Sequence, residues 1–346
     1  MRDEGMEILA DVHNLAVVGI IEVLKHYRIF RHVMNQLLAE IQKRKPIAVI
    51  GVDYPGFNLR FLQKIHCLLQ ANTVHQNTAN RTLIHLSPKL VQYISPQLWA
   101  WNEQRKWGMA EYLDLVLCIF PFEPSIYQVT KLKAVFVGHP LINTTFYPEE
   151  SRKSNLIALF PGSREKEIYA HMPVLAKLEA QMKATRSTLQ IAYACATSKN
   201  ASIIRSFAPH AQLEIPSLLL NSATVGVVCS GTATLEAALA GLPMCVIYRV
   251  AWPTYWLGRL LIKVPFLAMP NLLLKRSLVR EFIQSDFTVT KISQEVMSLL
   301  DHATYRASIR QGYQEVHTQL AREGDGKAAD KAATEILKLI QSENRR

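Results

Sequence analysis

Two turns rich in small and hydroxyl-bearing residues have the composition of sites that hold a diphosphate. One of them follows an apolar run that predicts a buried strand over 224–229, and a helical pattern begins at Thr232. The unpaired N–H groups at the start of such a helix point at an anion, and small residues let the backbone approach it. A well-capped core helix is the alternative interpretation. The candidate ligand-binding residues of this turn are Ser230, Gly231, Thr232, Ala233 and Thr234.

The second turn, Phe160-Pro-Gly-Ser-Arg164, repeats the plan of an apolar strand, a small-residue turn and a helix. Ser163 and Arg164 are its candidate ligand-binding residues, because a guanidinium can bridge phosphate oxygens bidentately. Alternatively, Arg164 is a surface residue paired with Glu167 or Glu236. Glu236 itself lies where it could accept hydrogen bonds from sugar or ribose hydroxyls. Both turns would converge at the carboxyl ends of parallel strands, which favours a nucleotide-diphosphate site.

Asp53 is the candidate for acid–base chemistry. It follows a strand expected over 47–52, so its carboxylate could face a site at the carboxyl edge of a sheet and take a proton from an attacking hydroxyl. Ordinary turn chemistry explains the Asp-x-Pro-Gly spacing equally. His139 could be a second acid or base, or a packing residue at a hinge.

These residues need an α/β framework to hold them. The chain has 346 residues, which exceeds one ordinary core, and strand-like and helix-like segments alternate along it. We expect a linker at 148–153, an exposed loop at 71–81, and charged helices from about residue 291. Helix is expected near 15–44, and further strands at 90–94, 113–119 and 134–137.

The net charge of +11 calls for an anionic partner. No recognisable nucleic-acid motif is present, so we expect no nucleic-acid partner. Basic residues instead flank apolar segments near residues 15–32 and 252–263, a blend that suits helices lying on an anionic bilayer. Core helices with snorkelling cations are the alternative. The predicted membrane-contact residues are Val17, Val18, Ile20, Ile21, Val23 and Leu24.

The cellular compartment is also predicted from what the sequence contains. No apolar run reaches the roughly 18 residues of a transmembrane helix, and the first residues lack a signal-peptide pattern. The five cysteines are scattered, without a C-x-x-C pair, and read as reduced core residues. We therefore expect a cytoplasmic protein.

A set of motifs, taken in chain order, makes the sequence resemble the lipid-A-disaccharide synthases along nearly its whole length. Their collinear order makes chance agreement improbable. The motifs are Gly51-Val-Asp-Tyr-Pro-Gly-Phe-Asn58, Ser95-Pro-Gln-Leu-Trp-Ala-Trp101, Phe120-Pro-Phe-Glu123, Val137-Gly-His-Pro-Leu141, Phe160-Pro-Gly-Ser-Arg164, Ser230-Gly-Thr-Ala-Thr-Leu-Glu236, Tyr248-Arg249 and Leu267-Ala-Met-Pro-Asn-Leu-Leu273.

The resemblance implies a GT-B glycosyltransferase of the α/β class, with two Rossmann-like domains and the active site in the cleft between them. It would transfer 2,3-diacylglucosamine from UDP to 2,3-diacylglucosamine 1-phosphate, forming the β-1,6 lipid A disaccharide 1-phosphate and UDP. Such enzymes belong to Gram-negative outer-membrane biogenesis and act as peripheral proteins on the inner face of the inner membrane. We expect an acceptor-side domain over 1–150, a UDP-sugar domain over 151–290 and C-terminal helices over 291–346, and a homodimer is compatible with this plan.

The resemblance also implies roles for individual residues. Asp53 would be the general base on the acceptor hydroxyl. Arg164 and the helix that follows Ser230–Thr234 would hold the leaving diphosphate, so no metal or other cofactor is expected. Glu236 and Asn271 would bind the ribose, uracil or sugar, and Arg249 is a further UDP-sugar-binding candidate.

The sequence departs from the family pattern at its start. The usual first strand and its Gly-Glu-x-Ser-Gly-Asp turn are not seen, so we expect a first domain that is truncated at its N-terminus, and residues 71–89 resemble an insertion. Two other interpretations therefore stay open. One is a catalytically impaired, UDP-binding peripheral membrane homologue, and the other is a different GT-B transferase that uses UDP-N-acetylglucosamine.

Overall fold

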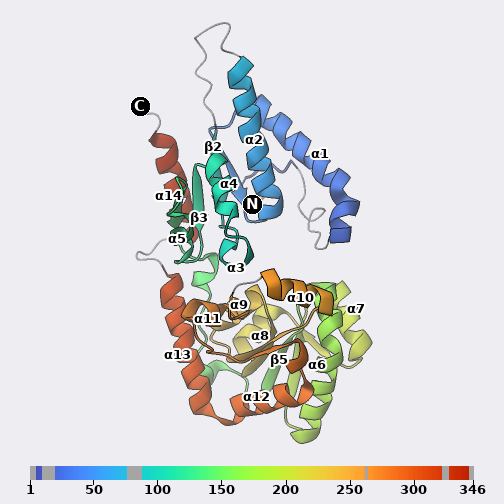
Figure 1. Cartoon of the computed structure of the whole chain (residues 1–346). Helices are drawn as coiled ribbons and strands as arrows, with labels where there is room; N and C mark the ends of the chain where they lie inside the picture. The colour runs from blue at the N-terminus through green and yellow to red at the C-terminus, as the bar shows by residue number, and fades with distance from the viewer. Residues whose placement is uncertain (1–4, 10–19, 76–87, 262–263, 322–326, 343–346) are drawn as a thin grey trace.

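The chain forms two α/β halves, each built on its own parallel sheet, and they lie one above the other in Figure 1. This computed structural model describes residues 5–9, 20–75, 88–261, 264–321 and 327–342. The first sheet has the strand order β1-β2-β3-β4, and the second has the order β10-β9-β8-β5-β6-β7. Parallel pairing requires a crossover between successive strands, and helices supply most of these crossovers.

The first half confirms the α/β pattern expected from the sequence. A row of apolar residues on α2, among them Leu59, Leu62 and Ile65, packs in the same core cluster as Val116 of β3. The strands are β1 Ala48–Val52, β2 Lys89–Tyr93, β3 Leu115–Cys118 and β4 Lys133–Phe136. The helices are α1 Ile20–Arg44, α2 Pro55–His75, α3 Leu98–Trp101, α4 Arg105–Tyr112 and α5 Glu123–Tyr127.

One loop prediction is wrong in part. The exposed loop expected over 71–81 begins too early, because α2 continues through His75. Residues 76–81 lie outside the described part of the chain. Polar residues such as Gln70 and Asn72 gave the end of α2 the composition of a loop.

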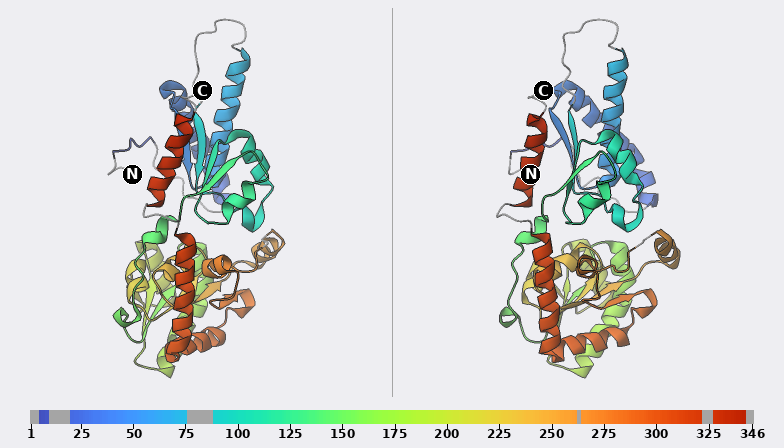
Figure 2. Two further views of the ribbon diagram at one scale, coloured as in Figure 1. Left: turned by 90° about the vertical axis from the view of Figure 1, so that its left-hand side faces the viewer. Right: turned by 60° about the vertical axis from the view of Figure 1, so that its left-hand side comes forward.

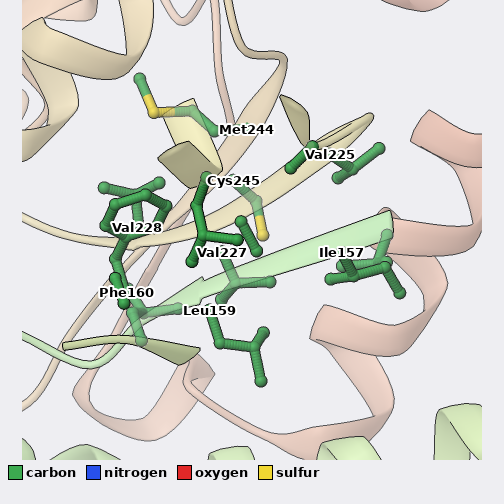
Figure 3. Close-up of a cluster of buried hydrophobic side chains, with 14 of the residues drawn as sticks. Ile157, Leu159, Phe160, Val225, Val227, Val228, Met244 and Cys245 are labelled. Carbon is green, nitrogen blue, oxygen red and sulfur yellow. The ribbon is translucent and has the colours of Figure 1, made fainter. Parts of the chain in front are cut away.

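The second half has the deeper core. Every residue of β5 and of β8 is buried, as expected for central strands covered on both faces. Figure 3 shows side chains of these strands and of β9 packed against one another. The strands are β5 Leu156–Phe160, β6 Gln190–Ala194, β7 Gln212–Glu214, β8 Val225–Cys229, β9 Met244–Tyr248 and β10 Glu281–Ile283. The helices are α6 Glu165–Thr185, α7 Ser198–Phe207, α8 Pro216–Ser222, α9 Thr232–Leu239, α10 Trp252–Leu261, α11 Met269–Leu274, α12 Val289–Asp301 and α13 Ala303–Leu320. Short 3-10 turns are η3 Pro140–Asn143, η4 Glu149–Ser151 and η5 Gln284–Asp286.

The last helix, α14 (Ala328–Gln341), returns to the first half. Its Ala332 packs with Val91, Leu115 and Leu117 of the first sheet, and Glu335 pairs with Lys133 at 3.2 Å. Figure 2 shows α14 beside the first sheet and α13 beside the second. The chain therefore crosses between the halves twice. The crossings meet at Gly138, where an added Cβ would lie 3.9 Å from atoms of both Leu320 and Ala328.

An apolar cluster, here called the bridging cluster, joins the halves. It brings residues that follow β3 together with residues of α9, α11 and α13. Its buried members are Ile119, Phe120, Leu235, Leu239, Met269, Leu273, Val316 and Leu320.

Gly241, just after α9, tests the packing of the second half. Its φ is 73°, and an added Cβ would lie 2.9 Å from the ring of Phe146. We expect Gly241→Ala to lower the free energy of unfolding by about 1–3 kcal/mol, because alanine resists this backbone conformation and the ring must move. Denaturant unfolding followed by circular dichroism measures the change.

Gly108→Ala is the matched control. Gly108 lies in α4 and has open space where the methyl group would go. This substitution should stabilise by up to about 1 kcal/mol, the ordinary helix preference for alanine. Similar midpoints for the two variants would contradict the tight packing at Gly241.

Candidate active site

The two small-residue turns lie next to each other because β5 and β8 are neighbouring parallel strands, with Phe160 paired to Val228. From this pair the strand order runs through β6 and β7 on one side and through β9 and β10 on the other. Such a reversal opens a crevice at the carboxyl edge, where open α/β sheets bind ligands. The predicted convergence of the two turns is therefore confirmed.

His171 links the first turn to the end of β9. The N–H of Arg249 donates to Nε2 of His171 at 2.9 Å, so Nδ1 carries the proton and donates to the carbonyl of Pro161 at 2.7 Å. Burial lowers the pKa of His171, which favours this neutral form. The ring fixes the turn and does not face a ligand.

Glu167 organises the first turn from the inside. Its Oε2 accepts from the backbone N–H groups of Ser163 and Arg164 at 3.2 and 3.3 Å. A Cβ on Gly162 would lie 2.7 Å from Glu167, so only glycine fits there. Arg164 pairs with Glu167 at 2.8 Å, yet its side chain remains 59% exposed. An ion pair this exposed is worth at most about 1 kcal/mol, so Arg164 can leave it for a ligand.

The second turn leaves donors free at the start of α9. Gly231 and Thr232 are exposed, and the backbone N–H groups of Thr232 and Ala233 have no acceptor within the described residues. Ser230 Oγ donates to the carbonyl of Leu267 at 3.0 Å. The open side of this turn is therefore made by backbone groups, as an anion site at a helix start requires.

Thr234 has a different position from the one predicted for a ligand donor. It is fully buried; its Oγ1 donates to the carbonyl of Gly231 at 2.8 Å and accepts from the N–H of Met269 at 3.1 Å. The structure therefore assigns Thr234 a structural role that ties α9 to α11.

Asn271 and Arg249 are likewise committed inside the protein. Asn271 is fully buried and makes four hydrogen bonds, which fills the capacity of its amide. Arg249 donates to the carbonyls of Gln284 and Phe287 at 3.1 and 2.6 Å, and its guanidinium stacks on the Phe287 ring. Asn271 has no amide group left for a nucleotide in this structure. Among the described residues, the side-chain hydrogen bonds of Arg249 occupy only its Nη2 atom, so its contact with a UDP-sugar stays a prediction.

For Glu236, binding of a hydroxyl group stays a prediction, and its surroundings are compatible with that role. It is half-buried one turn into α9, and its carboxylate has no hydrogen-bond partner among the described residues. Burial raises its pKa. A half-buried acceptor without a partner is suited to a sugar or ribose hydroxyl.

In the first half, Asp53 is held in a strained backbone conformation. Asp53 and Tyr54 have φ values of 50° and 39°. The carbonyl of Asp53 accepts from Asn58 Nδ2 at 2.7 Å and from Gln92 Nε2 at 3.1 Å, and its N–H donates to the carbonyl of Tyr93 at 2.8 Å. Such conformations cost about 1–3 kcal/mol each and gather at functional sites.

A cavity of about 240 Å³ lies beside Asp53, at the carboxyl ends of β1, β2 and β3. Ile119 and Phe120 line it and also belong to the bridging cluster, so the cavity abuts the second half. Gln97, Trp101 and Arg105 contribute further side chains.

The wall of this cavity is supported by a buried carboxylate. Glu123 Oε2 accepts from the N–H groups of Ile119 and Phe120 at 3.1 Å, and Oε1 accepts from the Trp99 indole at 3.3 Å. Burial raises the pKa of Glu123 to about 7. His139 packs on Phe120, and burial lowers its pKa to about 4, so the geometry favours its packing role over acid–base chemistry.

Several of these residues were not identified from the sequence. Gln92, His171 and Arg105 belong to no motif, and Glu123 ends the Phe120–Glu123 motif but was given no role. A polar residue inside an apolar strand, as Gln92 is, gives the one usable signal, because a buried amide must bond to something nearby.

The predicted membrane segment can be assessed only in part. Val17 and Val18 lie outside the described residues; Ile20, Ile21, Val23 and Leu24 belong to α1, but their side chains are outside the description. No helix within the described ranges is both long and apolar enough to cross a membrane.

Comparisons with known proteins agree on one family. The family model for lipid-A-disaccharide synthetase matches residues 1–336. A lipid-A-disaccharide synthase of Coxiella burnetii is 34% identical over 99% of this chain and 89% of that protein. In fold, the chain resembles the calicheamicin glycosyltransferase (TM-score 0.54, 13% identity, 92% and 82% of the two chains). It also resembles S. aureus MnaA solved with UDP (TM-score 0.52, 14% identity, 97% and 83%).

Glu123 gives a testable pH dependence. Its pKa lies near 7 in the folded protein, against an ordinary value of 4.5, so between these values the folded state keeps a proton that the unfolded state has lost. The contribution of Glu123 to stability therefore decreases as pH rises from about 4.5 to about 7. In Glu123→Gln this contribution is gone.

The stability difference between the variant and the parent isolates this effect from other titrating groups. The variant also loses an acceptor for the Trp99 indole, and this loss lowers its free energy of unfolding by the same amount at every pH. We expect the variant to be less stable than the parent at pH 4.5 and to recover progressively toward pH 7, in urea unfolding at several pH values. A constant difference across this range would exclude a raised pKa at Glu123.

Proposed function

The chain belongs to the lipid-A-disaccharide synthase family, and from this premise we propose which of its residues carry out the family's reaction. The protein is a GT-B glycosyltransferase of lipid A biosynthesis. It transfers 2,3-diacylglucosamine from UDP to 2,3-diacylglucosamine 1-phosphate and forms the β-1,6-linked disaccharide. The roles of individual residues are proposed from the geometry of the site.

Asp53 is the general base. Its carboxylate takes the proton of the acceptor 6-hydroxyl as that oxygen bonds to C1 of the donor sugar, and the bond from C1 to the diphosphate breaks. The observation that carries this role is the exposed Asp53 in its strained turn beside the cavity, next to the bridging cluster. Gln92 and Asn58 hold the carbonyl of Asp53, so the backbone that carries the carboxylate is fixed before the substrate arrives.

The leaving UDP is held by the two turns that follow β5 and β8, where the strand order reverses. The N–H groups of Thr232 and Ala233 lie at the positive end of the α9 dipole and donate to the diphosphate. Arg164 leaves its ion pair with Glu167 and binds the diphosphate instead. Glu236 accepts from a ribose or sugar hydroxyl. These groups neutralise the developing charge on the departing phosphate.

The division into domains follows the two sheets. We propose an acceptor-side domain over about 1–150 and a UDP-sugar domain over 151–290. Support comes from the two separate sheets, one ending at Phe136 and the other beginning at Leu156. The C-terminal helices over 291–346 are shared, since α14 packs on the first sheet.

We propose that the protein works at the inner face of the inner membrane, because its substrates are acylated, and that α10 is the described element best suited to meet the membrane. Trp252, Trp256 and Leu260 are 55%, 63% and 82% exposed and recur at the spacing of one helix face. Arg259 is exposed beside them. Aromatic and aliphatic anchors with a neighbouring cation favour an anionic lipid surface, in keeping with the net charge of +11.

The first experiment tests the base. Asp53→Asn should lower the rate of disaccharide formation about a hundredfold to ten-thousandfold, because the amide cannot take the proton. UDP affinity in titration calorimetry should stay within a few-fold, because UDP binds to the other half. Glu111→Gln, which alters an exposed carboxylate of α4, is the control and should keep full turnover. Full turnover by Asp53→Asn would remove Asp53 from the mechanism.

The second experiment tests α10. Trp256→Ser with Leu260→Ser should shift the protein from anionic vesicles to the supernatant in sedimentation, because each buried apolar side chain contributes roughly 1.5–3 kcal/mol. The control pair, Ile215→Ser with Leu218→Ser, removes similarly exposed apolar residues at α8. If the α10 variant binds vesicles as well as the parent does, α10 is not the membrane contact, and residues 17–24 become the candidate.

A further inference from the structure

The cavity beside Asp53 has opposite charges on different elements. Of the described residues that line it, Asp53 is the acidic one and Arg105 the basic one. Asp53 follows β1, whereas Arg105 is the first residue of α4, and the Ser95–Trp101 segment lies between them in sequence. The remaining lining is apolar or neutral, so the two charges set the polarity of the cavity.

Arg105 has no partner among the residues that the structure describes. The part of the chain that the structure describes shows no hydrogen bond or ion pair to its guanidinium, although the side chain is half-buried. Its neighbour Lys106 pairs with Glu103 at 2.5 Å. Other half-buried or buried arginines do have partners: Arg152 donates to three carbonyls through its two Nη atoms, and Arg186 pairs with Asp301.

A guanidinium without an acceptor among the described residues keeps its donors available for a ligand of the cavity. Burial raises the pKa of the Tyr112 hydroxyl, and the nearby positive charge of Arg105 opposes that rise. Both facts point to an anion that is supplied by a ligand of the cavity.

The acceptor sugar carries one anionic group, its 1-phosphate on C1, and the reacting 6-hydroxyl is attached through C5, on the other side of the ring oxygen. The Asp53 carboxylate repels a phosphate and needs a hydroxyl. We propose that Arg105 binds the 1-phosphate of the acceptor and so sets the orientation that presents the 6-hydroxyl to Asp53. This inference rests on the proposed role of Asp53 and adds to it the residue that selects a phosphorylated acceptor.

Arginine suits this task because its planar fork matches phosphate oxygens bidentately. Arg105 is the first residue of α4, so the positive end of that helix also attracts an anion bound near it. Trp101, which also lines the cavity, offers an apolar face to the sugar ring between the two charges.

The test compares two acceptors, 2,3-diacylglucosamine 1-phosphate and 2,3-diacylglucosamine, at saturating donor. Arg105→Gln should lower kcat/KM for the phosphorylated acceptor roughly 10- to 100-fold, the loss expected for a charge-assisted hydrogen bond. It should leave kcat/KM for the unphosphorylated acceptor within about threefold, because no contact to that molecule is removed. Arg105→Lys should recover part of the preference.

Inhibition supplies a second readout that does not require slow acceptors. Glucosamine 1-phosphate should inhibit the parent better than glucosamine does, and this difference should vanish in Arg105→Gln. Arg60→Gln, an exposed arginine of α2 outside the cavity, is the matched control and should behave as the parent. The fold should be unaffected, since surface changes without partners stay within about 0.5 kcal/mol.

Equal losses of Arg105→Gln on both acceptors would overturn the proposal and assign Arg105 a structural role. An undiminished preference for the phosphorylated acceptor would overturn it as well. Failure of the Asp53 role is a separate result: Asp53→Asn would then retain turnover, while the phosphate preference of Arg105 would persist.

Discussion

The bridging cluster is the contact on which the arrangement of the site depends. Ile119 and Phe120 form one side of it and also line the cavity beside Asp53. Leu235 and Leu239 form the other side and lie on α9, whose first residues offer donors to a diphosphate. Apolar packing has no directional bonds to break, so it holds two separately folded sheets in contact while leaving the polar groups at its border for substrates.

A second layer of buried polar groups keeps the site residues in place. His171 connects the first turn to β9, Asn271 and Glu281 fix the start of α11, and Glu123 fixes the turn after β3. Each of these groups is satisfied by the protein, as burial demands. The side chains of Glu236 and Arg105, in contrast, have no hydrogen-bond partner among the described residues and are only half-buried. These two are therefore better placed to bind a ligand than His171, Asn271 or Glu123.

The sequence predicted much of the framework and less of the site. Long apolar runs such as 224–229 and small-residue turns have strong local signals, and parallel sheets bring such turns together by rule. Asn271 and Thr234 were interpreted as ligand residues because they stand in family motifs, yet both are fully buried and bonded internally. Arg105 was missed because its distinguishing property, a missing partner, exists only in three dimensions. Local patterns reveal which residue types are near a site, whereas burial decides which of them can reach a substrate.

The two crossings between the halves have a mechanical consequence. One crossing follows β4 and the other precedes α14, and they touch at Gly138. Two connections set far apart would clamp the halves, and a single connection would let them swivel in any direction. Adjacent connections instead tie the halves together at one place, so a change in their relative orientation would turn about Gly138. The return of α14 to the first sheet thus makes the end of the chain part of the joint between the halves.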